Sequence, residues 1–279
     1  MMASYKPSIL VAAGRVALQQ ENQPEVGAMF LMMDLFDISQ LDITLDNRLL
    51  SAEEAGRYEK GIALLCDDVP LAHITGFQEF YGRKFKVTPD TLVPRPETEE
   101  LVHHVLSTIR SGVAADIGTG TGCIAISLDL EADFKVFCTD ISSAVLEVAR
   151  ENAEVLDSDV IFRQGDLLDP LVTEGVKLDV LVSNPPYIAE SERALMSRSV
   201  LDHDPHLALF ADDDGLLLYK RMIDDLPLVM KDDSYVFFEI GHAQGAALTD
   251  YIVKKYDVTV HIEQDINQLD RILWFRWCE

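Results

Sequence analysis

The sequence has few basic residues for its length. Its 279 residues include 23 lysines and arginines but 48 aspartates and glutamates, which gives a formal net charge of −25. Proteins that bind nucleic acid carry an excess of basic side chains to neutralise phosphates, and this chain has no such excess. We therefore expect no direct binding to nucleic acid, and a basic partner suits this charge better.

Cysteine is also scarce and forms no recognisable pattern. The four cysteines are Cys66, Cys123, Cys138 and Cys278. A disulfide framework or a zinc site would need paired or clustered spacings, so we expect reduced thiols, two of them in apolar runs typical of a core. His203, Asp204 and His206 lie close in sequence, but no further cluster supports them as ligands, so we expect no metal.

Long apolar runs are missing as well. No stretch reaches the roughly 20 apolar residues that cross a bilayer, and the N-terminus lacks the basic segment and apolar stretch of a signal peptide. The sequence thus predicts a cytoplasmic protein with no membrane contact. It contains no GxSxG, HExxH or Walker motif, which removes the signatures of serine hydrolases, zinc proteases and P-loop NTPases.

The patterns that are present predict two domains and a linker. Residues 1–75 have weak helical patterning, and Ser51 begins a capping box, which predicts a small N-terminal helical domain. Residues 76–94 place aromatic side chains around Gly82 and predict a linking β-hairpin. Residues 95–279 alternate between strand and helix patterns, which predicts an α/β domain with a parallel sheet.

The second domain should contain seven strands and five main helices. We expect strands at 113–117, 135–139, 160–163, 178–183, 234–240, 257–263 and 271–277. We expect helices at 97–110, 122–131, 142–156, 215–230 and 242–255. The last two strands have no helix between them, so they predict an antiparallel hairpin at one edge that completes a seven-stranded sheet.

A glycine-rich loop follows the first of these strands and opens a helix. Its residues are Gly118, Thr119, Gly120, Thr121 and Gly122. Glycines let the backbone approach a ligand closely, and the helix N-terminus offers free N–H groups. Asp140, after the next strand, could accept hydrogen bonds from both ribose hydroxyls. The pattern predicts a nucleoside-containing cofactor. The loop favours S-adenosylmethionine, but its GxGxxA reading from Gly120 leaves NAD open.

The motif Asn184-Pro185-Pro186-Tyr187 follows the strand expected at 178–183. Consecutive prolines hold the backbone rigidly and leave carbonyls without neighbouring N–H donors. Asn184 adds an oxygen acceptor and Tyr187 an aromatic face. Two acceptors and a ring suit a planar NH₂ group, so the motif favours a methyltransferase for an amide or exocyclic amine. We expect Asn184, Pro185 and Tyr187 to be catalytic, and all four residues to bind the substrate.

Two further segments are candidates for the site. Asp166 follows another expected strand, where it could accept a hydrogen bond from an adenine amine, and Leu167 could pack on the ring. Arg95 and Glu97 lie in a segment whose proline and acidic residues suit the first turn of a helix. On chemistry alone, capping is the better interpretation of that segment.

These segments, in this order and spacing, resemble the HemK/PrmC family of release-factor glutamine methyltransferases over nearly the whole chain. The matching stretches include PLAHITGFQEFYGRKFKV, LVPRPETEELV, DIGTGTGCIAISL, NPPYI, DPHLALFADDDGLLLYKRMI and FFEIGHAQG. The resemblance implies a class I S-adenosylmethionine-dependent methyltransferase with a Rossmann-like seven-stranded sheet. It implies methyl transfer to the N5 of the glutamine in the Gly-Gly-Gln motif of class-1 peptide chain release factors, with S-adenosylhomocysteine as product and modulated translation termination as outcome.

The resemblance also assigns roles to residues. It implies that the glycine loop, Asp140, Asp166, Leu167 and Asn184 hold the cofactor and that residues 184–187 hold the glutamine amide. It also implies that the helical domain of residues 1–75 recognises the substrate, the release factor. It makes Arg95 and Glu97 part of the wall of the active site, against the capping interpretation. The chain departs from the family at Leu167, where a family member can place an aromatic residue. It also has Asp204-Pro205 for the more frequent Glu-Pro, and Gln268-Leu-Asp-Arg for Gly-Arg-Asp-Arg.

Three alternatives remain beside this hypothesis. The NPPY motif also suits an adenine N6 or other exocyclic-amine methyltransferase, although the acidity of the chain argues against nucleic acid. A nucleotide-binding scaffold without catalysis would tolerate loss of Asn184. An NAD-dependent oxidoreductase would need a hydride-transfer site, and the sequence offers no candidate for one.

Overall fold

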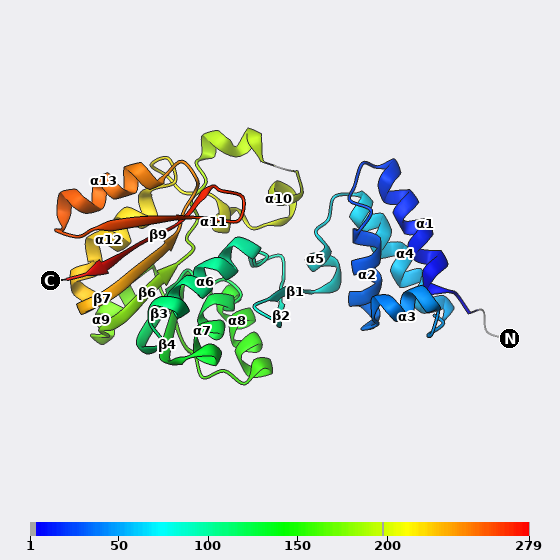
Figure 1. Cartoon of the computed structure of the whole chain (residues 1–279), viewed down its shortest axis with the longest axis horizontal. Coiled ribbons are helices and arrows are strands. Elements are labelled where there is room, and N and C mark those ends of the chain that lie inside the picture. The colour runs from blue at the N-terminus through cyan, green and yellow to red at the C-terminus, as the bar shows by residue number, and fades with distance from the viewer. Residues whose placement is uncertain (1–3, 197, 279) are drawn as a thin grey trace. The chain divides into compact units, whose positions relative to one another are not determined.

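A computed structural model describes residues 4–196 and 198–278, and the chain divides into two compact units. The first contains the described residues up to Phe77 together with the short helix α10 (Arg198–His203). The second contains the other described residues, from Gln78 onward. Figure 1 shows helices α1 to α5 of the first unit in blue and cyan, and the sheet of the second in green to red.

The first unit is helical. Its helices before the hairpin are α1 (Pro7–Gln20), α2 (Gly27–Phe36), α3 (Gln40–Leu45), α4 (Ala52–Cys66) and α5 (Leu71–Thr75). The capping box is confirmed, because Ser51 Oγ accepts from Glu54 N at 3.2 Å and the Glu54 carboxylate accepts from Ser51 N at 2.8 Å. Leu18, Leu31 and Tyr58 are buried in the core of this unit.

Among the described helices, none combines the length and the apolar character that crossing a bilayer requires.

A two-stranded hairpin follows, formed by β1 (Phe77–Phe80) and β2 (Arg83–Lys86). Its two-residue turn has positive φ at both positions, 50° at Tyr81 and 74° at Gly82. Such turns match the twist of the flanking strands, which explains why a glycine stands at the second position. The aromatic pattern around Gly82 predicted this element.

The second unit contains a seven-stranded sheet of order β5-β4-β3-β6-β7-β9-β8. The strands are β3 (Ser111–Ile117), β4 (Asp133–Asp140), β5 (Ile161–Gln164), β6 (Leu178–Ser183), β7 (Met230–Glu239), β8 (Val260–Gln264) and β9 (Asp270–Trp277). The first five are parallel, and β9 is antiparallel to both β7 and β8. The predicted α/β fold with an antiparallel pair at one edge is confirmed.

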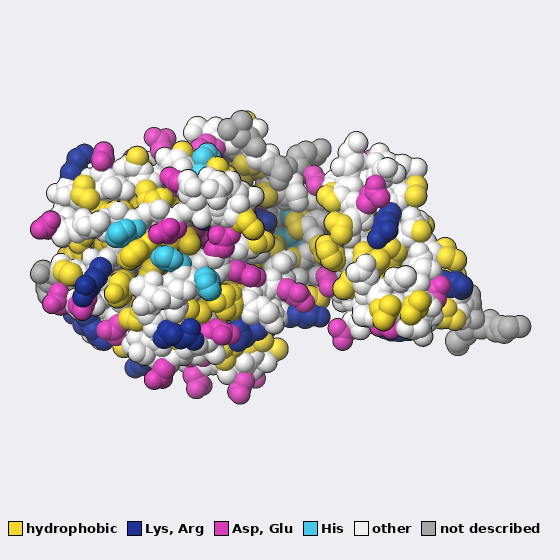
Figure 2. Space-filling model, viewed as in Figure 1, with side chains coloured by type: hydrophobic (Ala, Val, Ile, Leu, Met, Phe, Trp, Pro, Cys, Tyr) yellow, Lys and Arg dark blue, Asp and Glu magenta, His cyan; other side chains and the backbone are white. Residues whose placement is uncertain are grey.

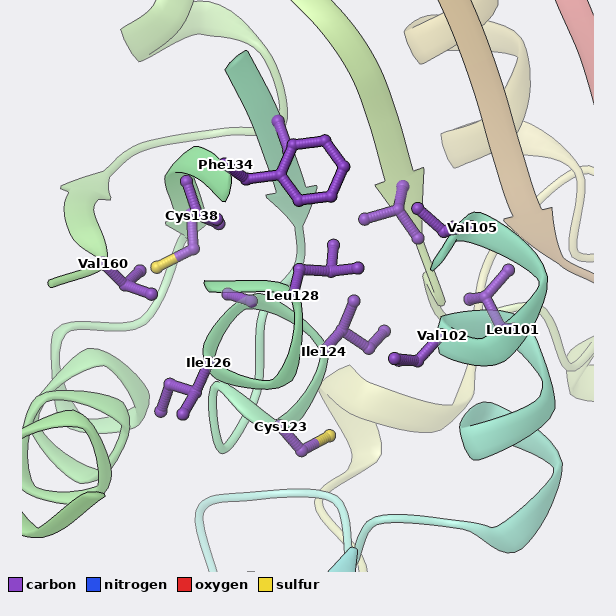
Figure 3. Close-up of a cluster of buried hydrophobic side chains, with 14 of the residues drawn as sticks. Leu101, Val102, Val105, Cys123, Ile124, Ile126, Leu128, Phe134, Cys138 and Val160 are labelled. Atoms are coloured by element: carbon purple, nitrogen blue, oxygen red, sulfur yellow. The ribbon is translucent and has the colours of Figure 1, made fainter. Parts of the chain in front are cut away.

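Helices cover both faces of this sheet (Figure 1). On one face lie α6 (Pro96–Thr108), α7 (Cys123–Glu131) and α8 (Ser143–Leu156), and on the other α9 (Asp169–Glu174), α12 (Leu217–Val229) and α13 (Gly245–Lys255). Each face of the sheet has its own hydrophobic core. Successive residues of a strand point to opposite faces, so Ala114 and Ala115 of β3 lie in different cores. Figure 3 shows the core on the α6 and α7 face of the sheet, where Val102 of α6 lies beside Ile124 of α7.

Short helices after β6 were not expected from the sequence. They are the 3₁₀ helix η1 (Glu190–Leu195), α10 and α11 (His206–Leu209). Each is too short to show a helical period, and the sequence predicted only a loop there. The order of strands reverses at β3, which has β4 on one side and β6 on the other. In sheets of this kind, that reversal opens a crevice at the carboxyl ends of the strands.

Candidate active site

A cavity of about 600 Å³ lies at this edge of the sheet, within the size range of sites for small molecules. Of the residues expected from the sequence, it is lined by Arg95, Gly118, Thr119, Gly120, Thr121, Asp140, Asp166, Leu167, Asn184 and Pro186. Gly122, Pro185, Tyr187 and Glu97 lie outside this lining. The carboxyl ends of β3, β4, β5 and β6 therefore bring together most of the residues that the sequence singled out.

The glycine loop leaves open space beside its backbone. Gly118 and Gly120 have φ of 74° and 57°, and a Cβ at either would meet no atom within 4 Å. Both glycines line the cavity, so a ligand can lie directly against the backbone there. Gly122 differs, because a Cβ would lie 3.0 Å from Ile126 and 3.3 Å from Ala149. This glycine allows α7 and α8 to pack closely.

Asp116, which lies just before the loop, fixes the position of the loop through hydrogen bonds. The carboxylate is fully buried, and its Oδ2 accepts from Thr119 Oγ1 at 2.6 Å and from Ala125 N at 3.3 Å. Burial raises the pKa of Asp116 to about 7, although these two hydrogen bonds oppose the rise. Asp116 therefore fixes the loop against the first turn of α7.

Asp140 ends β4 with its carboxylate at the cavity. Its Oδ2 accepts from Gly120 N at 3.2 Å and its Oδ1 from Ser142 N at 3.0 Å. Burial raises the pKa of this carboxyl group. Each carboxylate oxygen can accept a further hydrogen bond, so Asp140 can bind hydroxyl groups while it stays fixed. Together with the open glycines, this carboxylate fits a nucleoside-containing cofactor.

The segment after β5 contains a partner that the sequence did not reveal. Arg221 of α12 binds both carboxylate oxygens of Asp166, at 2.7 and 3.2 Å, and also lines the cavity. Leu167 has a positive φ of 47°, and its carbonyl accepts from Thr139 Oγ1 at 2.8 Å. Asp166 is therefore held by an ion pair, which its expected role at an adenine amine would have to accommodate.

Asn184 follows β6 and is held by two residues that sequence reasoning missed. Its Nδ2 donates to Thr98 Oγ1 at 3.1 Å, and Thr98 Oγ1 donates to Glu239 Oε2 at 2.7 Å. Thr98 belongs to α6 and Glu239 is the last residue of β7. An acidic residue at the end of the apolar run Val236–Phe238 was the available signal for Glu239.

Residues from three later segments of the chain contact Tyr187. Its carbonyl accepts from Gln244 Nε2 at 2.8 Å, and its hydroxyl accepts from Arg271 Nη1 at 3.4 Å. Burial raises the pKa of Tyr187 to about 12, so the ring is neutral at physiological pH. Gly215, with φ of 79°, lies so close that a Cβ there would fall 1.9 Å from the Tyr187 carbonyl oxygen.

The Arg95 segment both begins a helix and contributes to the cavity. α6 begins at Pro96 with Glu97 in its first turn, as the capping interpretation predicts. Arg95 also lines the cavity, and its Nη2 lies 2.5 Å from Oδ2 of the buried Asp204. Asp204 is therefore part of an ion pair. The described residues contain no group of three or more His, Cys, Asp or Glu side chains arranged to hold a metal.

Two family models match the chain. One is described as the Methyltransferase small domain and matches residues 96–208. The other is described as the PrmC N-terminal domain and matches residues 10–76.

Relatives of known annotation match nearly the whole chain. It is 43% identical over 279 residues to the release factor glutamine methyltransferase of Bacillus subtilis, covering 96% of this chain and 94% of the relative. It is 41% identical over 263 residues to that of Staphylococcus aureus, covering 93% and 95%. A solved methyltransferase structure from Pyrococcus furiosus has a TM-score of 0.54 at 18% identity, covering 82% of this chain and 100% of the other, which shows the fold alone.

Proposed function

The chain belongs to the release factor glutamine methyltransferase family, and on that premise we propose that it methylates the glutamine N5 in the Gly-Gly-Gln motif of class-1 peptide chain release factors. The methyl donor is S-adenosylmethionine, and S-adenosylhomocysteine is the product. One observation carries the proposal: Asp140 and Asn184, from the ends of β4 and β6, line one cavity. A cofactor group and an acceptor group can therefore meet there.

The residues that would hold the cofactor are the glycine loop and Asp140. The loop offers backbone beside the open glycines, and the Asp140 carboxylate suits the ribose hydroxyls. Leu167 and Asp166 would border the adenine. When bound, the cofactor supplies a methyl group on a sulfonium, which is reactive toward a nitrogen nucleophile.

The NPPY residues would bind and orient the amide. An amide nitrogen is a poor nucleophile, because its lone pair is delocalised into the carbonyl. Asn184 Oδ1 and the Pro185 carbonyl would accept its two hydrogens, which aims the nitrogen and stabilises the positive charge that develops on it. The Tyr187 ring would lie against the amide, and the Arg95 segment would form part of the surrounding wall.

The charge of the chain supports a protein partner. Figure 2 shows acidic side chains dispersed over the visible face of both units, and the net charge is −25. Such a surface repels phosphate backbones and attracts basic partners. The helical first unit would help to bind the release factor. Because the proposed substrate acts in translation, we expect the enzyme to act in the cytoplasm.

Methyl transfer to purified release factor tests the proposal directly. Labelled S-adenosylmethionine is offered with the release factor or with a copy whose Gly-Gly-Gln glutamine is alanine. We expect label only on the unaltered protein. Label on both copies would contradict the proposed site, and label on DNA instead would support the exocyclic-amine alternative.

Asp140→Ala should weaken cofactor binding. Hydrogen bonds to a charged group contribute about 1.5–3 kcal/mol, so we expect the Kd for S-adenosylmethionine to rise roughly 10- to 100-fold, measured by calorimetry. Asp250→Ala, which removes an exposed carboxylate from α13, is the matched control. An unchanged Kd in Asp140→Ala would rule out the ribose contact.

A further inference from the structure

Glu239 is a buried carboxylate that the proposed chemistry does not use directly. Its exposure is 2%, and it ends β7 behind Asn184 rather than in the lining of the cavity. Burying a carboxylate is unfavourable unless hydrogen bonds compensate. Its partners connect it to the NPPY motif, because Thr98 donates to its Oε2 and accepts from Asn184 Nδ2.

The chemistry of these groups sets the direction of the hydrogen bonds. An ionised carboxylate can only accept, so the Thr98 hydroxyl must donate to Glu239. That hydroxyl oxygen then accepts from the NH₂ end of the Asn184 amide at 3.1 Å. The two ends of a planar amide diverge, so Oδ1 points away from Thr98. Since Asn184 lines the cavity, this oxygen is the end that can accept a hydrogen bond from the NH₂ group that is to be methylated.

Building on the proposed function, we propose that Glu239 is a positioning residue. It acts through Thr98, and through the direct interaction of its carboxylate with the Asn184 NH₂, to keep the oxygen of Asn184 facing the amide nitrogen that receives the methyl group. With the opposite orientation, the Asn184 NH₂ would face the NH₂ of the substrate, and neither could accept a hydrogen bond from the other. Whether Asn184 presents an acceptor or a donor to the substrate therefore depends on a carboxylate that does not contact the substrate.

We call the hydrogen-bonded chain Glu239–Thr98–Asn184 the relay. Protonation of Glu239 would reverse the direction of its hydrogen bonds. Burial raises the pKa of Glu239 to about 7, and Arg271 and the hydrogen bonds from Thr98 and Asn184 oppose the rise. The charged or titratable groups around Glu239 are Glu97, Cys123, Tyr187, Tyr219 and Arg271. Burial raises the pKa values of the cysteine and both tyrosines, so these stay neutral near pH 7. A protonated Glu239 could donate to Thr98, and Thr98 could then donate to Asn184.

The sign of the pH dependence follows from this reversal. The active orientation needs ionised Glu239, so kcat should rise with pH through about 7 in the wild type. Glu239→Gln removes the charge at every pH, and its amide can present either its oxygen or its NH₂ to Thr98, so the direction of the hydrogen bonds is no longer fixed. We expect this variant to lose the limb near pH 7 and up to about 100-fold in kcat, with little change in cofactor Kd. Wild-type kcat with an unchanged limb would overturn the proposal.

Thr98 provides a matched pair of variants. Thr98→Ser keeps the hydroxyl and should retain activity within a few-fold, whereas Thr98→Val keeps the shape, removes the hydroxyl and should resemble Glu239→Gln. Because the protein interface is intact, we expect the loss in kcat rather than in KM for the release factor. Equal activity of the serine and valine variants would contradict the relay.

A readout without substrate separates this inference from the proposed function. The Asn184 side-chain NH₂ resonances, assigned by their loss in Asn184→Ala, should shift with a midpoint near pH 7 in the wild type. The shift should vanish in Glu239→Gln. Resonances that ignore both pH and the Glu239 substitution would refute the relay. This result does not depend on any methyl transfer, so it stands even if the release factor is not the substrate.

Discussion

In Asn184→Ala, we expect methyl transfer to the release factor to fall by roughly 30- to 1,000-fold in kcat. Loss of one preorganised polar partner of a developing charge weakens transition-state stabilisation by about 2–4 kcal/mol. The Asn184 amide is preorganised here, because its Nδ2 is already bound to Thr98 at 3.1 Å. The measurement is single-turnover transfer of labelled methyl at saturating cofactor, which isolates the chemical step.

Two comparisons make this prediction specific. Asn267→Ala, an exposed asparagine between β8 and β9, should leave the rate unchanged. The cofactor Kd of Asn184→Ala should change far less than its kcat, because Asp140 and the glycine loop remain. If Asn184→Ala turned over at nearly the wild-type rate, Asn184 would have no role in orienting the acceptor.

Gly215→Ala should be the second strongly damaging change. The added Cβ would lie 1.9 Å from the Tyr187 carbonyl oxygen and 2.6 Å from Gln244 Nε2, and the residue has φ of 79°. Because the Tyr187 carbonyl oxygen belongs to the backbone, it can make room for the added Cβ only if the NPPY segment moves. Misplacement of catalytic groups by about 1 Å can lower a rate 100-fold, so we expect a loss of about that size in kcat.

A matched glycine separates this effect from backbone strain. Gly175 also has a positive φ, 66°, but a Cβ there would meet nothing within 4 Å. Gly175→Ala should therefore lower the free energy of unfolding by about 1–2 kcal/mol without changing kcat. Urea denaturation of both variants reports the stability change. Full activity in Gly215→Ala would mean that the NPPY segment does not depend on this close contact.

The strand and helix pattern of the second unit was predictable because each element is long enough to show its period. The strand expected at 178–183 matches β6 (Leu178–Ser183), and the glycine turn of the hairpin was recognised at Gly82. The elements α9, η1, α10 and α11 were missed, since helices of four to six residues show no clear periodicity. The assignment of α10 to the first unit depends on long-range contacts that no local pattern encodes.

The candidate site was predictable where its chemistry lies in consecutive residues. The glycine loop and Asn184 were found in this way, and both line the cavity. Thr98, Glu239 and Arg221 were missed, because each meets its partner across 55 to 141 residues of sequence. An acidic residue at a strand end is common, and only the fold shows which one is buried against Asn184.

The order of strands in the sheet also constrains how the protein can be made. β9 is synthesised after β8 but lies between β8 and β7. β8 therefore has no neighbour to pair with until β9 has docked, and β7 keeps an open edge for the same interval. Exposed edges template pairing with other chains, so this interval is when aggregation competes with folding. During translation, the second unit can begin to collapse early, but its sheet closes only when its latest strand arrives.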